Sequence, residues 1–157
     1  VGVSVVNALS IHLKAEVYRD GKVWTQEYKL GKPQFKVKTT GKTDRRGTTI
    51  SYHADPGIFE SIHVEWKTIV DHMRQQAYLT KGVFIAISDE RTETARAYHF
   101  YFEGGIASHV RYLNRNKTVL HKHVYLEKVV DNVSCEVAVQ YTDDYCSPLA
   151  PIRFGVG

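Results

Sequence analysis

The first residues whose types and spacing could do chemistry are Val1-Gly2-Val3, which run directly into a segment with helical periodicity. The apolar residues of that segment recur at i and i+3 or i+4, namely Val5, Val6, Leu9 and Leu13. This spacing predicts a helix with a buried face from about Val3 to Leu13. A glycine at a helix start lets the backbone approach a ligand, and the free N–H groups there favour an anion such as phosphate. An ordinary helix start has the same pattern, so the residues alone leave both interpretations open.

A second candidate is Gly47-Thr48-Thr49, where a glycine leads into a β-branched, alternating run. A threonine hydroxyl both donates and accepts a hydrogen bond, which suits the edge of a nucleobase if the residue lines a pocket. Threonine also favours strands after a turn, so this motif by itself decides nothing.

Metal and acid–base chemistry find little support in the sequence. His121 and His123 could share a strand face, but spacing supplies no third ligand, so we expect no metal site. The paired acids Asp89-Glu90 and Asp143-Asp144 fall in turns, where carboxylates usually make local hydrogen bonds. No spacing nominates a catalytic triad, and we therefore assign no catalytic residue.

Two basic clusters could meet phosphate or simply be solvated: the loop from Lys42 to Arg46, and Arg111, Arg115 and Lys117. The net charge of +4 and pI of about 9.0 permit a nucleic-acid partner without requiring one. With 43% hydrophobic and 24% charged residues, the composition is that of a soluble globular protein.

The lack of a recognisable targeting signal and the small number of cysteines favour a cytoplasmic protein. No apolar stretch approaches the ~20 residues of a membrane helix, and no signal peptide is recognisable. Two cysteines, Cys135 and Cys146, are too few for a disulfide framework and suit a reducing cytosol. The chain begins with valine and has one methionine, Met73, so we expect a piece of a longer chain.

The elements that must position these residues alternate between strands and helices. Asp20-Gly21 predicts a hairpin between strands 14–18 and 23–30, followed by strands at 35–38 and 48–53. An amphipathic helix is expected over 64–79, followed by strands 83–88 and 95–102. This order favours an α+β fold with helices on one face of an antiparallel sheet.

The glycine pair of Glu103-Gly104-Gly105 interrupts the preceding strand pattern, and we place a domain boundary there. A helix is expected over 106–114 and two strands over 124–127 and 133–141, joined by a turn at Val130-Asp131-Asn132. The predicted domains are therefore 1–103 and 104–157.

Seven stretches together resemble one family, formed by the B subunit of DNA gyrase and the B-type subunit of topoisomerase IV. They match that family in order and spacing over about residues 1–145: Val1-Gly2-Val3-Ser4-Val5-Val6-Asn7-Ala8-Leu9-Ser10, Tyr18-Arg19-Asp20-Gly21-Lys22, Gly47-Thr48-Thr49, Leu79-Thr80-Lys81-Gly82-Val83, Glu103-Gly104-Gly105-Ile106, Tyr112-Leu113-Asn114-Arg115-Asn116-Lys117-Thr118 and Glu136-Val137-Ala138-Val139-Gln140-Tyr141.

The resemblance implies the C-terminal part of an ATPase domain of the GHKL type, the fold shared with Hsp90 and histidine kinases. It implies that the start of a βαβ-containing transducer domain, similar to domain 2 of ribosomal protein S5, follows from residue 104. In the family, ATP binding with Mg²⁺ closes a dimer of B subunits, and hydrolysis accompanies passage of one DNA duplex through another. The implied partners are an A-type subunit, DNA and a second B subunit, in a bacterial cytoplasm next to the nucleoid.

The resemblance also assigns residues. Val1 and Gly2 match the end of the family's glycine-rich phosphate loop, so Val1, Gly2 and Val3 are expected to line the triphosphate. Thr48 matches the threonine at the adenine end of the pocket, and Arg19 matches the rim arginine that binds aminocoumarin inhibitors.

Other parts of the family pattern are missing. The general-base glutamate, the adenine-reading aspartate, the Mg²⁺ ligand and the γ-phosphate lysine match no residue here, so we expect this segment to be inactive by itself. Residues 146–157 depart from the family, and Pro148 and Pro151 would obstruct the helix expected there.

The alternative function is a non-enzymatic nucleic-acid-binding module that uses Arg111, Arg115 and Lys117. A third hypothesis is another GHKL ATPase, such as a mismatch-repair or chaperone protein.

Overall fold

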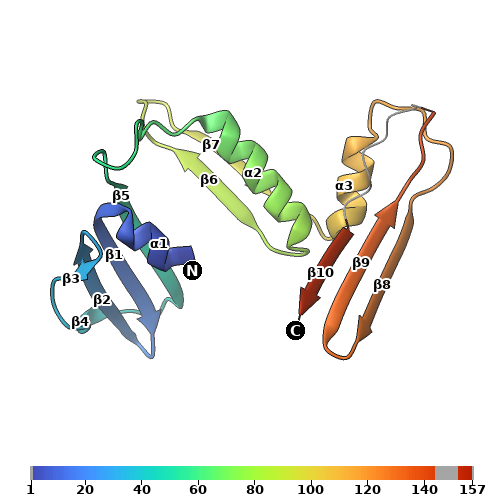
Figure 1. Cartoon of the computed structure of the whole chain (residues 1–157). Helices are drawn as coiled ribbons and strands as arrows, with labels where there is room; N and C mark the ends of the chain where they lie inside the picture. The colour runs from blue at the N-terminus through green and yellow to red at the C-terminus, as the bar shows by residue number, and fades with distance from the viewer. Residues whose placement is uncertain (1, 144–151, 157) are drawn as a thin grey trace. The chain divides into compact units, whose positions relative to one another are not determined.

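The structure is a computed structural model that describes residues 2–143 and the backbone of 152–156 (Figure 1). The chain divides into two compact units, Val1–His63 and Val64–Gly157, which are described separately below. Among the described residues, no helix combines the length and the apolar character needed to cross a membrane.

The first unit is a small antiparallel sheet with one short helix. Its elements are α1 (Gly2–Ala8), β1 (Ser10–Arg19), β2 (Lys22–Lys29), β3 (Lys32–Pro33), β4 (Lys38–Lys42) and β5 (Gly47–Ala54). The strand order is β3-β2-β1-β5, and β4 also pairs with β2. The predicted hairpin is confirmed: Asp20 and Gly21 have φ of 55° and 71°, the two positive values that a tight β1–β2 turn requires.

Two expectations for this unit were wrong. The opening helix ends at Ala8, and Leu13 lies on β1, where it is 2% exposed. The β1 backbone pairs with strands on both sides, and these ladder hydrogen bonds prevail over the helical spacing of the side chains. No described residue of α1 is buried, and Val3 is 57% exposed. Residues 35–37, expected in a strand, connect β3 to β4 instead.

The second unit contains α2 (Trp66–Leu79), β6 (Ile85–Asp89), β7 (Arg96–Phe100), α3 (Gly105–Leu113), β8 (Val124–Val130), β9 (Val133–Val139) and β10 (Ile152–Val156). β6 and β7 form a two-stranded hairpin along α2, and β8 to β10 form a separate sheet in the order β10-β9-β8. The helices near 64–79 and 106–114 and the β8–β9 turn are therefore confirmed, while β6 and β7 are shorter than expected. The described strands make three antiparallel sheets rather than one.

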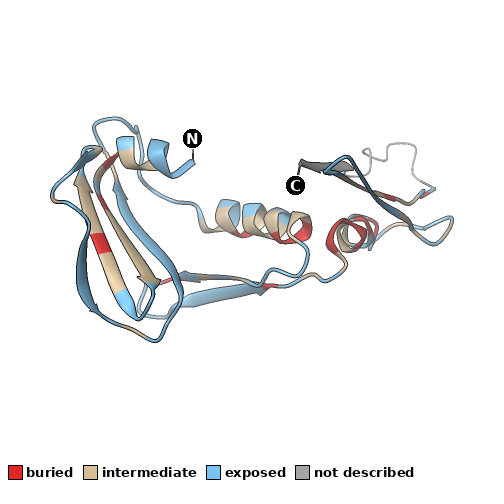
Figure 2. Ribbon diagram, turned by 90° about the horizontal axis from the view of Figure 1, so that it is seen from below, coloured by how far each residue is buried: buried red, intermediate tan, exposed pale blue. Residues whose placement is uncertain are grey.

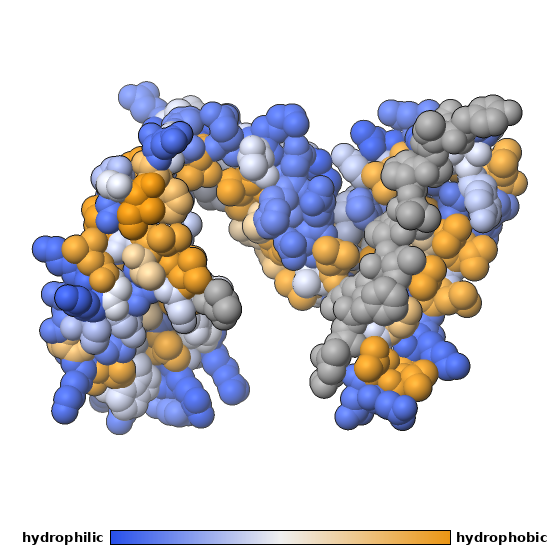
Figure 3. Space-filling view, viewed as in Figure 1, coloured by the Kyte–Doolittle hydropathy of each residue, from blue (hydrophilic) through white to orange (hydrophobic). Residues whose placement is uncertain are grey.

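Two hydrophobic clusters stabilise this unit (Figure 2). In one, Val70 and Ala77 of α2 pack with Phe100 of β7. In the other, Ile106 and Val110 of α3 are among the residues that pack with Ala138 of β9. Figure 3 shows that hydrophobic side chains also reach the surface near the β8–β9 turn, where Val130 and Val133 are exposed.

An aromatic stack connects α2 to α3. The Tyr78 ring lies 3.9 Å from the Phe102 ring and 4.7 Å from the His109 ring, measured between centroids, and both pairs are nearly parallel. On the same side, Arg74 donates hydrogen bonds to Asp71 (2.8 Å) and to the Tyr112 hydroxyl (3.3 Å).

His109→Phe is expected to stabilise the second unit by about 1 kcal/mol, because a flat ring stays in the stack while an unsatisfied polar atom is removed. Nδ1 of His109 is buried and has no hydrogen-bond partner among the described residues. Burial also lowers the pKa of His109 below its ordinary 6.5, so its neutral form is preferred in the folded chain. Stability should therefore decline in the wild type as the pH falls below 6.5, and urea titrations at pH 7.5 and 5.5 should show a smaller decline in the variant.

Candidate functional site

The sheet of the first unit positions Thr48. In the antiparallel register, Thr48 of β5 pairs with Val17 of β1, and Val17 pairs with Trp24 of β2. Directly paired residues project from the same face of a sheet, so these three side chains share one face. The next row on that face holds Ile50, which is 38% exposed, Ala15 and the polar Gln26. Thr48 thus stands at one end of a mainly apolar sheet face that could hold a flat ligand.

The neighbouring threonine projects from the opposite face. The Thr49 hydroxyl donates to the Tyr18 hydroxyl at 3.4 Å, and the Arg45 guanidinium lies 5.3 Å from the centre of the Tyr18 ring. Thr48 and Thr49 therefore have different surroundings although they are adjacent in sequence. This makes Thr49 a matched control for Thr48.

Arg19 lies at the same end of the sheet as Thr48. It follows Val17 by two residues, which places it on the same face, at the start of the β1–β2 turn. Its side chain is exposed, and its Nε lies 3.3 Å from Asp20. An open hollow of about 380 Å³ begins here, lined by Arg19, Asp20, Gly21, Thr43, Asp44, Arg45 and Arg46. The structure thus brings two predicted site residues, Arg19 and Thr48, to one end of one face.

The other predicted site residues lie in or before α1. Val1 is outside the described residues, and Gly2 and Val3 are exposed in the first turn of the helix. A Cβ atom added at Gly2 would meet nothing within 4 Å, so its backbone is open to a ligand. α1 contacts β1 and β5 and joins β1 at Ser10, which pairs with Ala54 at the end of the strands away from Thr48. That end is about 20 Å from Thr48 at the usual rise of a strand.

The remaining candidates have local structural roles. His121 donates from Nδ1 to the Lys122 carbonyl (2.7 Å) and accepts at Nε2 from the Tyr141 N–H (3.0 Å). Arg111 bonds to Ser108 (2.9 Å), and Arg115 bonds to the Tyr112 carbonyl (2.8 Å) within its own helix end. In the part of the chain that the structure describes, no group of three or more His, Cys, Asp or Glu residues could hold a metal ion.

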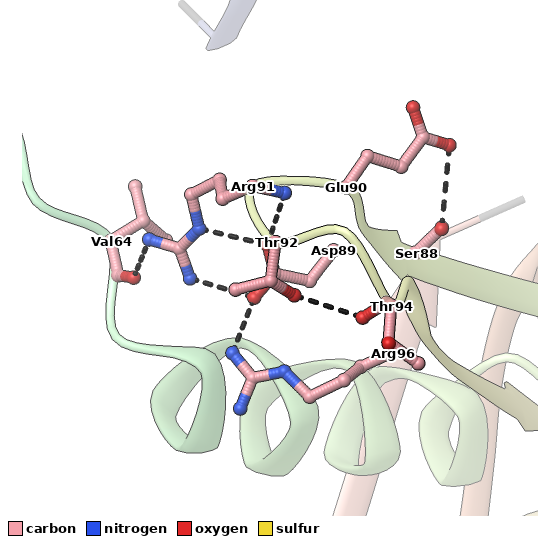
Figure 4. A network of polar contacts seen from close by, with 8 residues as sticks. All are labelled: Val64, Ser88, Asp89, Glu90, Arg91, Thr92, Thr94 and Arg96. Carbon is pink, nitrogen blue, oxygen red and sulfur yellow. Dashed lines mark hydrogen bonds and ion pairs between the residues drawn. The ribbon is translucent and has the colours of Figure 1, made fainter.

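Sequence reasoning missed the extent of one polar network, centred on Asp89 (Figure 4). The expected local hydrogen bond is present, from the Arg91 N–H at 3.2 Å, but Asp89 is the last residue of β6, paired with Arg96, rather than part of a turn. The structure adds two guanidinium groups: Arg91 binds both carboxylate oxygens (2.8 and 2.9 Å), and Arg96 binds one of them (2.6 Å). Arg91 also donates to the Val64 carbonyl at 2.7 Å. Two arginines within seven residues of an acid were the available signal.

This network is electrostatically strong. The side chain of Asp89 is 4% exposed, and its hydrogen bonds to Arg91 and Arg96 hold its pKa well below the ordinary 3.8. The Arg96 guanidinium also lies 5.3 Å from the centre of the Trp66 ring, at the start of α2. Asp89 therefore has a structural role: through Arg91 and Arg96 it connects the β6–β7 hairpin to the segment that begins α2.

Comparison with known proteins identifies relatives over nearly the whole chain. The DNA gyrase B subunit of Haloferax volcanii is 44% identical over 149 residues, covering 92% of this chain and 23% of that protein. The corresponding gyrase B protein of Staphylococcus epidermidis is 42% identical over 151 residues, covering 95% of this chain and 24% of that protein. The chain thus spans about a quarter of the length of these relatives. No family model matches it.

A solved structure agrees with this result. The 43K ATPase domain of Thermus thermophilus gyrase B, in complex with an aminocoumarin, matches with a TM-score of 0.82 and 28% identity. The match covers 93% of this chain and 40% of that one, and it confirms the α+β fold of a GHKL-type ATPase domain. By sequence and by fold, the chain belongs to the DNA gyrase B family, of which it represents one segment.

Proposed function

We propose that this chain is part of the B subunit of an ATP-dependent type II DNA topoisomerase, and that the Thr48 face of the first unit forms one wall of its nucleotide pocket. The observation that carries the proposal is the 42–44% identity to gyrase B along 92–95% of the chain. The shared end of Arg19 and Thr48 supports it, since the gyrase B domain with the same fold holds an aminocoumarin.

The residues present fit part of a nucleotide site. Thr48 offers a hydroxyl beside apolar neighbours, which suits the polar edge and flat faces of adenine. The open backbone at Gly2 suits close approach by the phosphates, with Val1 and Val3 beside it. Arg19 is assigned to the rim, where it would contact an inhibitor rather than take part in catalysis. ATP would supply the free energy for closing the dimer of B subunits, and Mg²⁺ would accompany it without a ligand assigned in this chain.

The proposed partners follow from the same role: an A-type subunit, DNA and a second B subunit, in the cytoplasm beside the nucleoid. We further propose that residues from 104 on belong to the transducer domain. The separate clusters of α2 with β7 and of α3 with β9 support that boundary, and the Tyr78–His109 stack would connect the two parts.

The alternative, a nucleic-acid module based on Arg111 and Arg115, loses support because both guanidinium groups bond within α3 or at its end. A mismatch-repair or chaperone ATPase is disfavoured because the Haloferax and Staphylococcus relatives, at 42–44% identity, are gyrase B proteins.

Thr48→Ala is expected to weaken ATP binding about 2- to 10-fold in a B subunit that contains this segment, because one neutral hydrogen bond is worth about 0.5–1.5 kcal/mol. The measurement is the KM for ATP in DNA-stimulated hydrolysis and supercoiling with an A-type subunit. Thr49→Ala, on the opposite face, should leave the KM unchanged. A protein that neither hydrolyses ATP nor changes DNA topology would refute the function, and equal effects of the two variants would refute the role of Thr48.

A further inference from the structure

A row of basic residues crosses one corner of the first unit. Arg19 of β1 pairs with Lys22 of β2, and Lys22 pairs with Lys42 of β4. Paired residues project from the same face, so three cations on three neighbouring strands face the same way. With strands about 4.8 Å apart, the row is about 10 Å long. The corner lies at the β1–β2 turn, where the surface is hydrophilic (Figures 1 and 3).

This arrangement of charges is unfavourable for the stability of the sheet. Like charges directly opposite each other destabilise an antiparallel pair. Arg19 has an ion pair with Asp20 (3.3 Å), but within the described part of the chain no carboxylate pairs with Lys22 or Lys42. The Lys22 ammonium lies 5.9 Å from the centre of the Trp24 ring, a cation–π contact that offsets part of the repulsion but supplies no counter-charge. The row is therefore available to a bound anion.

The adjacent loop adds two more cations and is held against the same turn. The Thr43 N–H donates to the Gly21 carbonyl at 3.1 Å, and the Arg45 N–H donates to the Thr43 hydroxyl at 3.0 Å. The Arg45 guanidinium packs over Tyr18, and Arg46 follows it along the open hollow. Arg19, Arg45 and Arg46 thus line the hollow together with Asp20 and Asp44. Lys22 and Lys42 follow and precede the lining residues Gly21 and Thr43 and share the face of Arg19, whereas Arg45 packs over Tyr18 on the other face.

We propose that this basic corner binds the phosphodiester backbone of duplex DNA without reading its sequence. The choice of DNA rests on the proposed function, whereas the affinity for phosphate rests on the charges described above. A row of about 10 Å is longer than one phosphate ion and spans more than one phosphate of a DNA strand, because the strand carries one charge per ~3.4 Å of helix axis and winds around that axis. The open, exposed shape of the hollow suits a polymer that passes across it.

The test is fluorescence anisotropy of a labelled duplex of about 20 base pairs with the 157-residue chain, without ATP, at several chloride concentrations. Lys42→Glu should weaken binding by about 10-fold or more at roughly 50 mM salt and reduce the steepness of the log affinity against log salt plot by about 1 to 2. The same variant should raise the Tm by about 1–3 °C, because Lys22 then faces an opposite charge. Loss of binding in a more stable protein cannot come from misfolding.

Lys32→Glu is the matched control. Lys32 faces Lys29 across the β2–β3 turn, so this variant makes the same charge change at a second lysine pair at the other end of β2. It should weaken DNA binding by less than about 3-fold. No binding by the wild type, or equal losses in both variants, would overturn the proposal. Displacement of the duplex by millimolar inorganic phosphate beyond an ionic-strength-matched chloride control would indicate a single-phosphate site and would also overturn it. None of these outcomes depends on ATP hydrolysis, so this test can fail while the proposed function holds.

Discussion

Tyr78→Ala is expected to lower the free energy of unfolding of the second unit by about 3–5 kcal/mol, the usual cost of removing a buried aromatic ring. The Tyr78 side chain is 4% exposed and lies between the Phe102 and His109 rings. Its removal would leave a cavity between α2 and α3 and would remove both stacking contacts. Because α2 and α3 lie on either side of the proposed domain boundary, this ring is also the contact through which we expect the two parts to be held together.

Hydrogen exchange measured along the chain can locate this effect. Amide protection should fall in α2 and α3 and stay unchanged in β1 and β2 of the first unit, which serves as an internal reference. Tyr101→Ala is the control, since Tyr101 is 51% exposed, and it should cost under about 1 kcal/mol. Tyr78→Phe should retain most of the stability, because the ring rather than the hydroxyl makes the stack. Equal losses for Tyr78→Ala and Tyr101→Ala would contradict the structural role of the stack.

Asp89→Asn is expected to lower the Tm of the second unit by about 5–10 °C, because it removes the charge that two guanidinium groups share. Asparagine keeps the shape of the side chain, but it is uncharged and has one oxygen. It therefore cannot accept the hydrogen bonds that Arg91 and Arg96 donate to the two carboxylate oxygens. Arg91 would then hold the Val64 carbonyl less firmly, and the start of α2 should exchange its amides faster. Glu90→Gln is the control: Glu90 is exposed and has one long contact, with Ser88 at 3.4 Å.

The same network predicts a pH dependence. The pKa of Asp89 is lowered in the folded chain, so its contribution to stability is complete above its ordinary value of 3.8 and is lost as the pH falls toward the folded value. Thermal unfolding between about pH 6 and pH 2.5 should therefore show a smaller acid destabilisation in Asp89→Asn than in the wild type below about pH 4. An unchanged acid profile in the variant would show that other carboxylates dominate.

Local sequence determined a large part of the fold. Asp20-Gly21 fixed the β1–β2 hairpin because glycine and aspartate tolerate the positive φ angles of its turn. The periodicity over 64–79 was sufficient to predict α2, since Val70 and Ala77 recur on one apolar stripe that packs with Phe100 of the β6–β7 hairpin. The order and spacing of the seven motifs depend on the residues alone, and they were sufficient to identify the family.

Tertiary structure decided what depends on partners distant in sequence. The spacing of Leu9 and Leu13 fits a helix, but Ser10 and the residues after it form a strand because β2 and β5 supply backbone partners on both sides. The register places Thr48 and Arg19 at one end of one face, and Lys22 opposite Lys42, through pairings between separate strands. The sequence by itself thus determined the local turns, the α2 helix and the family, since these depend on short-range periodicity and on motif spacing. Only the tertiary structure decided where α1 ends and which charges meet, because strand pairing sets both.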